Sequence, residues 1–292
     1  MGAQVNGPQL RLLVGVDLTE RSRNAFSRAL VLAGAGGGSL TLLHVTSAEL
    51  PQKLVAAHDS FATDVLEEHT LRARAEGVGS IAKVIAHGRD YEMIIEQARK
   101  DDSDLIILGT HRPSSVLQDM LGTTVDRVLR LGGIPLLLAR RKAEHAYASI
   151  VVAIDFSPAS RRALEKVLRW FPQARITAVT AYGSPRRSLL TNDDAARESV
   201  AETQRLALKG FLAEIVQSLG PGHAADVSRV VPLVQHGWAE DVILRTVEES
   251  KPDLVVIGTH ARGGLEHAVL GSVAEWVLTE APCDVLAVPP PK

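Results

Sequence analysis

Short apolar runs alternate with longer amphipathic segments along the whole chain, a pattern typical of parallel strands connected by helices. The apolar runs of the first half predict buried strands over Leu10–Asp17, Leu40–Val45, Ile81–Ala86, Leu105–Leu108 and Ile134–Ala139. The segments between them predict helices over Ser22–Ala33, Asp59–Ala75, Tyr91–Arg99 and from Gly122 to Leu131. The first half is therefore expected to be an α/β domain with a parallel sheet.

The same order begins again after a charged stretch without periodicity, residues 140–148. The second half predicts strands over Ile150–Asp155, Ile176–Ala181, Val230–Val234, Leu254–Ile257 and Val285–Val288. Helices are predicted from Ser157-Pro158, over Glu198–Leu219 and over His267–Thr279. We expect two tandem Rossmann-like domains, residues 1–141 and 149–292, each a doubly wound five-stranded parallel sheet with strand order 3-2-1-4-5. In such a sheet ligands bind at the carboxyl ends of strands one and four, where the winding reverses.

Composition narrows the class of protein without identifying a ligand. Apolar residues make up 46% of the chain and aromatic residues only 4%, so we expect the aliphatic cores of parallel sheets. The formal charge of −2 gives no electrostatic reason to expect nucleic acid or an anionic membrane as a partner. No apolar run approaches the roughly 18 residues of a membrane span. The start of the chain lacks the features of a signal peptide, and the lone Cys283 excludes an intrachain disulfide, so we expect a cytoplasmic protein.

A pair of glycines recurs after the fourth predicted strand of each half. The pairs are Gly258 with Gly271 and Gly109 with Gly122, each thirteen positions apart, and Ser272 and Thr123 follow the second glycine. Such glycines can serve a turn alone. Their repetition favours an anion site instead, in which backbone N–H groups near the glycines, the helix N-terminus and the Ser or Thr hydroxyl bind phosphates.

Asp17 and Asp155 end the first predicted strand of each half. Each carboxylate can cap the helix that follows, or it can accept hydrogen bonds from an adenine amino group or a ribose hydroxyl. A carboxylate repels phosphate, so in the second case it lies at the base or sugar end of the pocket. The sequence leaves both roles open.

Other motifs give weaker indications. The paired histidines, His111 with His260 and His87 with His236, lack companion ligands at metal-binding spacing, so loop histidines are the better interpretation. Cys283 has no basic neighbour in sequence and is expected in the core. The first-strand turns lack the Gly-x-Gly-x-x-Gly of dinucleotide enzymes, and neither a P-loop nor a Gly-x-Ser-x-Gly elbow occurs.

Together these residues resemble the universal stress protein family in its tandem two-domain form. ATP-binding members carry Gly-x-x-Gly-x9-Gly-Ser/Thr after strand four and an Asp at the end of strand one. This chain has Gly258-x-x-Ala261-x9-Gly271-Ser272 and Gly109-x-x-Arg112-x9-Gly122-Thr123. The second glycine is thus replaced in both copies. Ala261 is a mild change if its φ is negative and an obstruction otherwise, whereas Arg112 could crowd the phosphate path or reach a phosphate, so the second-half site is favoured.

The resemblance implies ATP binding, with or without Mg²⁺, in one or both halves. It places adenine near Val45 and Ala181 at the ends of the second strands, and phosphates near the starts of the helices that contain Thr124 and Val273. It also implies a regulatory or stress-survival role with at most slow hydrolysis, an intrachain pseudo-dimer formed through the fifth strands, and a possible homodimer.

Two other functions stay open at this stage. One is a nucleotide-free module of the same fold that acts through protein partners or another small ligand, which the substitutions Ala261 and Arg112 favour. The other is a nucleotidyl-transfer enzyme, which would need catalytic His or Lys motifs on the glycine loop.

Overall fold

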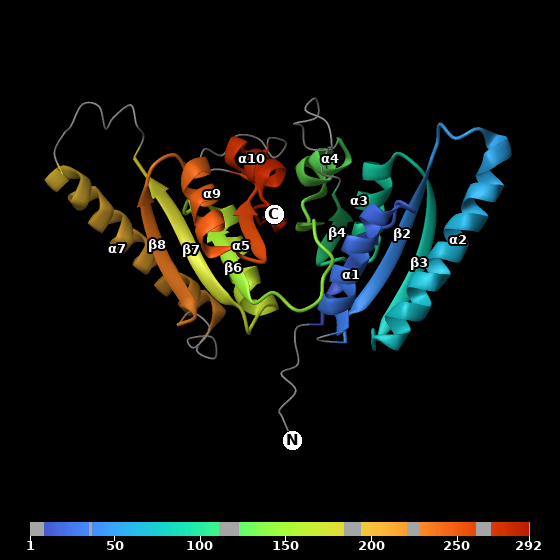
Figure 1. Cartoon of the computed structure of the whole chain (residues 1–292), viewed down its shortest axis with the longest axis horizontal. Coiled ribbons are helices and arrows are strands. Elements are labelled where there is room, and N and C mark those ends of the chain that lie inside the picture. The colour runs from blue at the N-terminus through green and yellow to red at the C-terminus, as the bar shows by residue number, and fades with distance from the viewer. Residues whose placement is uncertain are drawn as a thin grey trace, which may run out of the picture. The chain divides into compact units, whose positions relative to one another are not determined.

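The computed structural model describes residues 9–34, 37–110, 123–183, 194–220, 228–260 and 270–291. The chain divides into two compact units, Met1–Ala146 and Tyr147–Lys292. Each unit is a parallel sheet covered by helices. In Figure 1 the first unit is coloured from blue to green and the second from green to red.

The first unit contains a five-stranded parallel sheet in the order β3-β2-β1-β4-β5. Its elements are β1 (Arg11–Gly15), α1 (Glu20–Gly34), β2 (Ser39–Ser47), α2 (Gln52–Ala75), β3 (Ser80–Gly88), α3 (Asp90–Lys100), β4 (Leu105–Gly109), α4 (Thr123–Gly132) and β5 (Leu136–Ala139). Helix α1 packs on β1 and β4, α2 packs on β2 and β3, and α3 packs against α4. The predicted doubly wound order is confirmed.

The second unit repeats this topology with the sheet order β10-β9-β6-β7-β8. Its elements are β6 (Ser149–Ala153), α5 (Pro158–Trp170), β7 (Arg175–Tyr182), α7 (Asp194–Leu219), β8 (Val230–His236), α9 (Ala239–Ser250), β9 (Leu254–Gly258), α10 (Ser272–Glu280) and β10 (Asp284–Val288). The strand that follows β6 in the chain lies on one side of it and β9 lies on the other, so the winding reverses between β6 and β9.

The cores of both units are aliphatic. The central strands carry unbroken apolar runs. The first four residues of β4 and of β9 are almost fully buried. Burial on both faces of the sheet explains why these runs do not alternate with polar residues. No helix within the described residues combines the length and the hydropathy needed to cross a membrane.

Helix boundaries depart from the sequence predictions by more than two residues in three places. Helix α2 begins at Gln52 rather than Asp59, and α7 begins at Asp194 rather than Glu198. The helix predicted from His267 is wrong at its start, because Leu270 and Gly271 are not helical and α10 begins at Ser272. Gly271 has an extended backbone, with φ −66° and ψ 145°, and serves as the N-cap.

Candidate functional site

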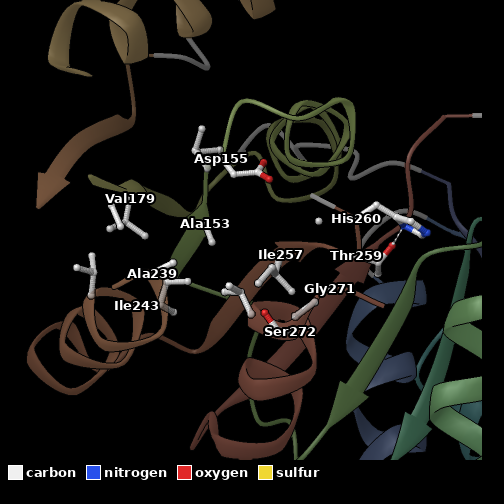
Figure 2. A pocket seen from close by; sticks show the side chains of 16 residues that line it. Ala153, Asp155, Val179, Ala239, Ile243, Ile257, Thr259, His260, Gly271 and Ser272 are labelled. Atoms are coloured by element: carbon white, nitrogen blue, oxygen red, sulfur yellow. Dashed lines mark hydrogen bonds between the residues drawn. The ribbon is translucent and has the colours of Figure 1, made fainter. Parts of the chain in front are cut away.

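A cavity of about 130 Å³ lies at the carboxyl ends of β6 and β9 in the second unit (Figure 2). Its position is the reversal point of the sheet, where doubly wound folds bind ligands. The predicted residues that line it are Asp155, Ala181, Gly258, Gly271, Ser272 and Val273. Ala261, the remaining predicted residue of this half, lies outside the described residues.

The wall of the cavity is mostly apolar. Ala153, Val179 and Ile257 contribute from the sheet, and Ala239, Val242 and Ile243 contribute from the first turns of α9. The sequence analysis missed the α9 residues, although apolar positions three and four apart after His236-Gly237 are the signal that would have found them. A wall of this kind suits the flat faces of an aromatic ring.

Asp155 is fixed at the start of α5 by a tight local turn. Its Oδ1 accepts hydrogen bonds from the Ser157 backbone N–H at 3.0 Å and from the Ser157 hydroxyl at 2.6 Å. Ser157, not Asp155, is the N-cap of α5, because its Oγ accepts from the Ser160 N–H at 3.1 Å. The intervening Phe156 adopts a left-handed backbone with φ 62°. Within the described residues these bonds use Oδ1 and leave Oδ2 available to a ligand.

The first unit repeats this turn. Asp17 Oδ1 accepts from the Thr19 N–H at 2.9 Å and from the Thr19 hydroxyl at 2.8 Å, and Leu18 between them has φ 61°. A left-handed non-glycine residue costs about 1–2 kcal/mol. Its occurrence at the same place in both units shows that the strand-end carboxylate is held in a defined position, which the sequence analysis could not distinguish from helix capping.

Gly258 and Gly271 occupy their positions for different physical reasons. A Cβ on Gly258 would lie 2.8 Å from Ala159 Cβ and 2.9 Å from Ser160 N, so only glycine allows α5 to approach β9 this closely. Among the described residues, a Cβ on Gly271 would meet nothing closer than Thr259 O at 3.5 Å. Packing against the described part of the chain therefore does not require glycine at 271.

The start of α10 presents hydrogen-bond donors to the cavity. The Gly271 N–H donates to Thr259 O at 2.9 Å, so this N–H is not a free donor, and free donors near Gly271 come from the residues that follow it. The first intrahelical bond runs from Glu275 N to Gly271 O, and the N-cap, Gly271, has no side chain with which to cap the helix. The N–H groups of Ser272, Val273 and Ala274 consequently lack acceptors among the described residues, and the Ser272 hydroxyl is exposed beside them.

His260 closes one side of the cavity. Its Nδ1 lies 2.7 Å from the Thr259 hydroxyl, and its buried Nε2 has no hydrogen-bond partner among the described residues. The other predicted histidines do not join it. His87 contacts Asp59 at 2.8 Å, His236 packs edge-on against Tyr182, and His111 lies outside the described residues. In the described parts of the chain no three His, Cys, Asp or Glu side chains form a metal-binding group.

A second cavity, of about 360 Å³, occupies the corresponding place in the first unit. The predicted residues Asp17, Val45, Gly109 and Thr124 line it. Thr123 begins α4, whereas Arg112 and Gly122 lie outside the described residues. The lining residues that the sequence prediction did not include are Gly15, Val16, Ser22, Leu43, Asp90, Ile94, Leu108 and Val125. Partial burial raises the pKa of the Asp90 carboxyl.

Comparison with known proteins finds matches to one protein family in both units. The Universal stress protein family matches residues 10–140 and again residues 146–289. The chain is 24% identical over 299 residues to universal stress protein E of Photorhabdus laumondii, covering 96% of this chain and 94% of the relative. It is 22% identical to universal stress protein E of Escherichia coli K12, covering 96% and 93%. Among solved structures, a universal stress protein from Archaeoglobus fulgidus shares the fold with a TM-score of 0.68 at 19% identity, covering 96% of this chain and 98% of that one.

Proposed function

The chain belongs to the universal stress protein family, with two family domains in tandem, and from this premise we propose that the pocket of its second unit binds ATP in a regulatory or stress-survival role. The observation that carries the proposal is the uncapped start of α10. Its free N–H groups and the exposed Ser272 hydroxyl face the same cavity as the apolar wall. Helix N-termini of this kind bind phosphate through their N–H groups and dipole.

The remaining lining groups support an adenine nucleotide with a definite orientation. Figure 2 shows Asp155 and Ser272 well separated across the cavity. Phosphates placed at Ser272 avoid repulsion by the Asp155 carboxylate, and Oδ2 of Asp155 then accepts hydrogen bonds from ribose hydroxyls or the base. The base lies against the apolar residues of β7 and α9, such as Val179 and Ile243.

Binding rather than rapid turnover fits the described lining. Asp155 is its only carboxylate, and it lies away from Ser272, where the phosphates are proposed to bind. General-base catalysis needs a base within hydrogen-bond reach of the attacking water. We therefore propose at most slow hydrolysis, with Mg²⁺ serving the phosphates and not a dedicated protein site.

Gly271→Val tests the proposal directly. The added side chain occupies the open space beside the start of α10, so we expect isothermal titration to show ATP affinity reduced by more than about a hundredfold. Gly210→Val is the matched control, because Gly210 lies on α7 outside the cavity and a Cβ there meets nothing within 4 Å.

Circular dichroism should show both variants folded. Unchanged ATP affinity in Gly271→Val would contradict the assignment of the phosphate site. Absence of ATP binding by the wild-type chain would favour the nucleotide-free interaction module instead.

A further inference from the structure

The two cavities differ at one position with a large chemical consequence. Asp90 is the first residue of α3 and lines the cavity of the first unit, whereas Ala239 is the first residue of α9 and lines that of the second. Both follow a His-Gly pair at the end of the preceding strand, so they occupy equivalent places in the repeat. Four positions further along each helix the two cavities share the same residue type, Ile94 in the first and Ile243 in the second. The base-binding wall of the second unit is thus apolar, while that of the first carries a carboxylate.

The Asp90 carboxylate accepts a hydrogen bond from its own backbone N–H but has no hydrogen-bonded side-chain partner among the described residues. No described side chain donates a hydrogen bond to it, and the described lining of this cavity contains no Lys, Arg or His. His44, whose positive charge would favour the ionised carboxylate, has its pKa lowered by its own burial. The other carboxylate of the cavity, Asp17, is engaged through Oδ1 with Thr19.

A ligand that covers Asp90 removes water from this carboxylate and must replace the lost hydrogen bonds. An ionised carboxylate only accepts hydrogen bonds, and leaving it unpaired in a covered site is costly. Guanine presents two adjacent donors, N1–H and the N2 amino group, which match the two oxygens of one carboxylate. Adenine presents a single amino group beside a ring nitrogen that is an acceptor and repels the second oxygen.

We propose that the cavity of the first unit selects a guanine base over adenine, with Asp90 as the specificity-determining residue. This inference rests on the proposed function only in taking both cavities as nucleotide sites. Thr124 of α4 lines the first cavity where Val273 of α10 lines the second, so the phosphate ends of the two cavities correspond in position. The chain then carries one adenine site and one guanine site.

Isothermal titration of the full-length Gly271→Val chain with GTP and with ATP tests the inference, because this background blocks the second cavity. We expect GTP to bind at least tenfold more tightly than ATP, since a carboxylate that the wrong ligand covers and leaves unpaired costs that much or more. Asp90→Asn keeps the size of the side chain and replaces one acceptor by a donor, so the preference for GTP should disappear.

The reciprocal change gives an independent check. In the otherwise wild-type chain, Ala239→Asp places an unpaired carboxylate in the base wall of the second cavity, and we expect ATP affinity to fall at least tenfold. Ala239→Val is the control for added volume without charge.

The inference and the proposed function fail in different ways. Where ATP affinity in the Gly271→Val chain has fallen more than about a hundredfold from wild type, ATP binding equal to or tighter than that of GTP, or no binding of either nucleotide, overturns the guanine assignment and leaves the second cavity's ATP site intact. Unchanged ATP affinity in this chain overturns the proposed function instead. A wild-type chain that binds GTP but no ATP overturns the proposed function and retains the guanine site.

Discussion

We propose that Asp155 performs two tasks with its two carboxylate oxygens. Oδ1 accepts from the backbone N–H and the hydroxyl of Ser157 and so orients the N-cap of α5. Oδ2, which has no partner among the described residues, is proposed to bind the ligand. The sequence offered capping and ligand binding as alternatives for Asp155. The structure assigns the capping itself to Ser157, and the proposed nucleotide uses the second oxygen.

Asp155→Asn separates the two tasks. The amide oxygen can still accept from Ser157, so the free energy of unfolding should stay within about 0.5 kcal/mol of wild type. The amide nitrogen cannot accept a ribose hydroxyl or a base amino group, so we expect ATP affinity to fall about tenfold or more. Chemical denaturation and ATP titration measure the two effects.

Asp155→Ala provides the comparison, because it removes both oxygens and should also destabilise the chain by about 1 kcal/mol. An Asn variant with wild-type ATP affinity would show that Asp155 has only the structural task.

Gly258 and Gly271 show that a repeated glycine spacing predicts a shared role but does not reveal why each position is glycine. Their spacing and repetition predicted a common phosphate-binding purpose. Gly258 is explained by its close approach to Ala159 and Ser160, a tertiary contact between β9 and α5 that no local pattern encodes. Gly271 has no such contact with the described residues and is the better indicator of a ligand.

At the scale of elements, the site is assembled from the ends of strands and the starts of helices. The strands were predictable because buried parallel strands leave continuous apolar runs. The start of α10 was not, because His267–Thr279 has helical periodicity throughout while Gly271 adopts an extended backbone. The role of α9 was missed because its cavity-lining positions also fit an ordinary core-facing stripe.

Ser272→Asp tests the start of α10 by effects of opposite sign. An acidic residue in the first turn interacts favourably with the helix dipole, so stability should rise by about 0.3–1 kcal/mol. The same charge lies where we propose that phosphate binds, so ATP affinity should fall by about tenfold or more. Thermal unfolding and ATP titration report the two effects.

Ser272→Asn is the uncharged control of similar size. Equal ATP affinity in the Asp and Asn variants would mean that phosphate does not bind at this helix terminus.

At the scale of the whole chain, the first unit contains histidines whose pKa values are lowered by burial. The first unit contains His44, a histidine on β2 that is only 4% exposed. Its Nδ1 lies 2.7 Å from Val16 O, to which it donates, and burial lowers the pKa of the ring below the usual 6.5. Burial lowers the pKa of His69 on α2 of the same unit as well.

These shifts predict that mild acid destabilises the first unit. Below pH 6.5 the unfolded chain binds a proton at His44 that the folded unit binds only at lower pH, so stability falls as the pH falls through this range. The slope is at most about 1.4 kcal/mol per pH unit for each such histidine. Urea unfolding at about pH 7.5 and pH 5.5 measures it.

Two probes separate the units, because Trp170, Trp238 and Trp276 all lie in the second unit while circular dichroism reports on both. Loss of helical signal should precede the change in tryptophan fluorescence at the lower pH. His44→Gln, which keeps a donor but does not titrate, should reduce the pH dependence. An unchanged dependence in that variant would show that His44 is not responsible.

The most direct test of the proposed adenine nucleotide site measures the nucleotide that the chain retains. The freshly purified chain is incubated with ATP and Mg²⁺, and free ligand is removed. The chain is then denatured, and the released nucleotides are quantified by chromatography and mass spectrometry. We predict about one adenine nucleotide per wild-type chain and almost none from Gly271→Val. No adenine nucleotide from the wild-type chain, or equal amounts from both chains, would contradict the assignment of ATP to the second unit.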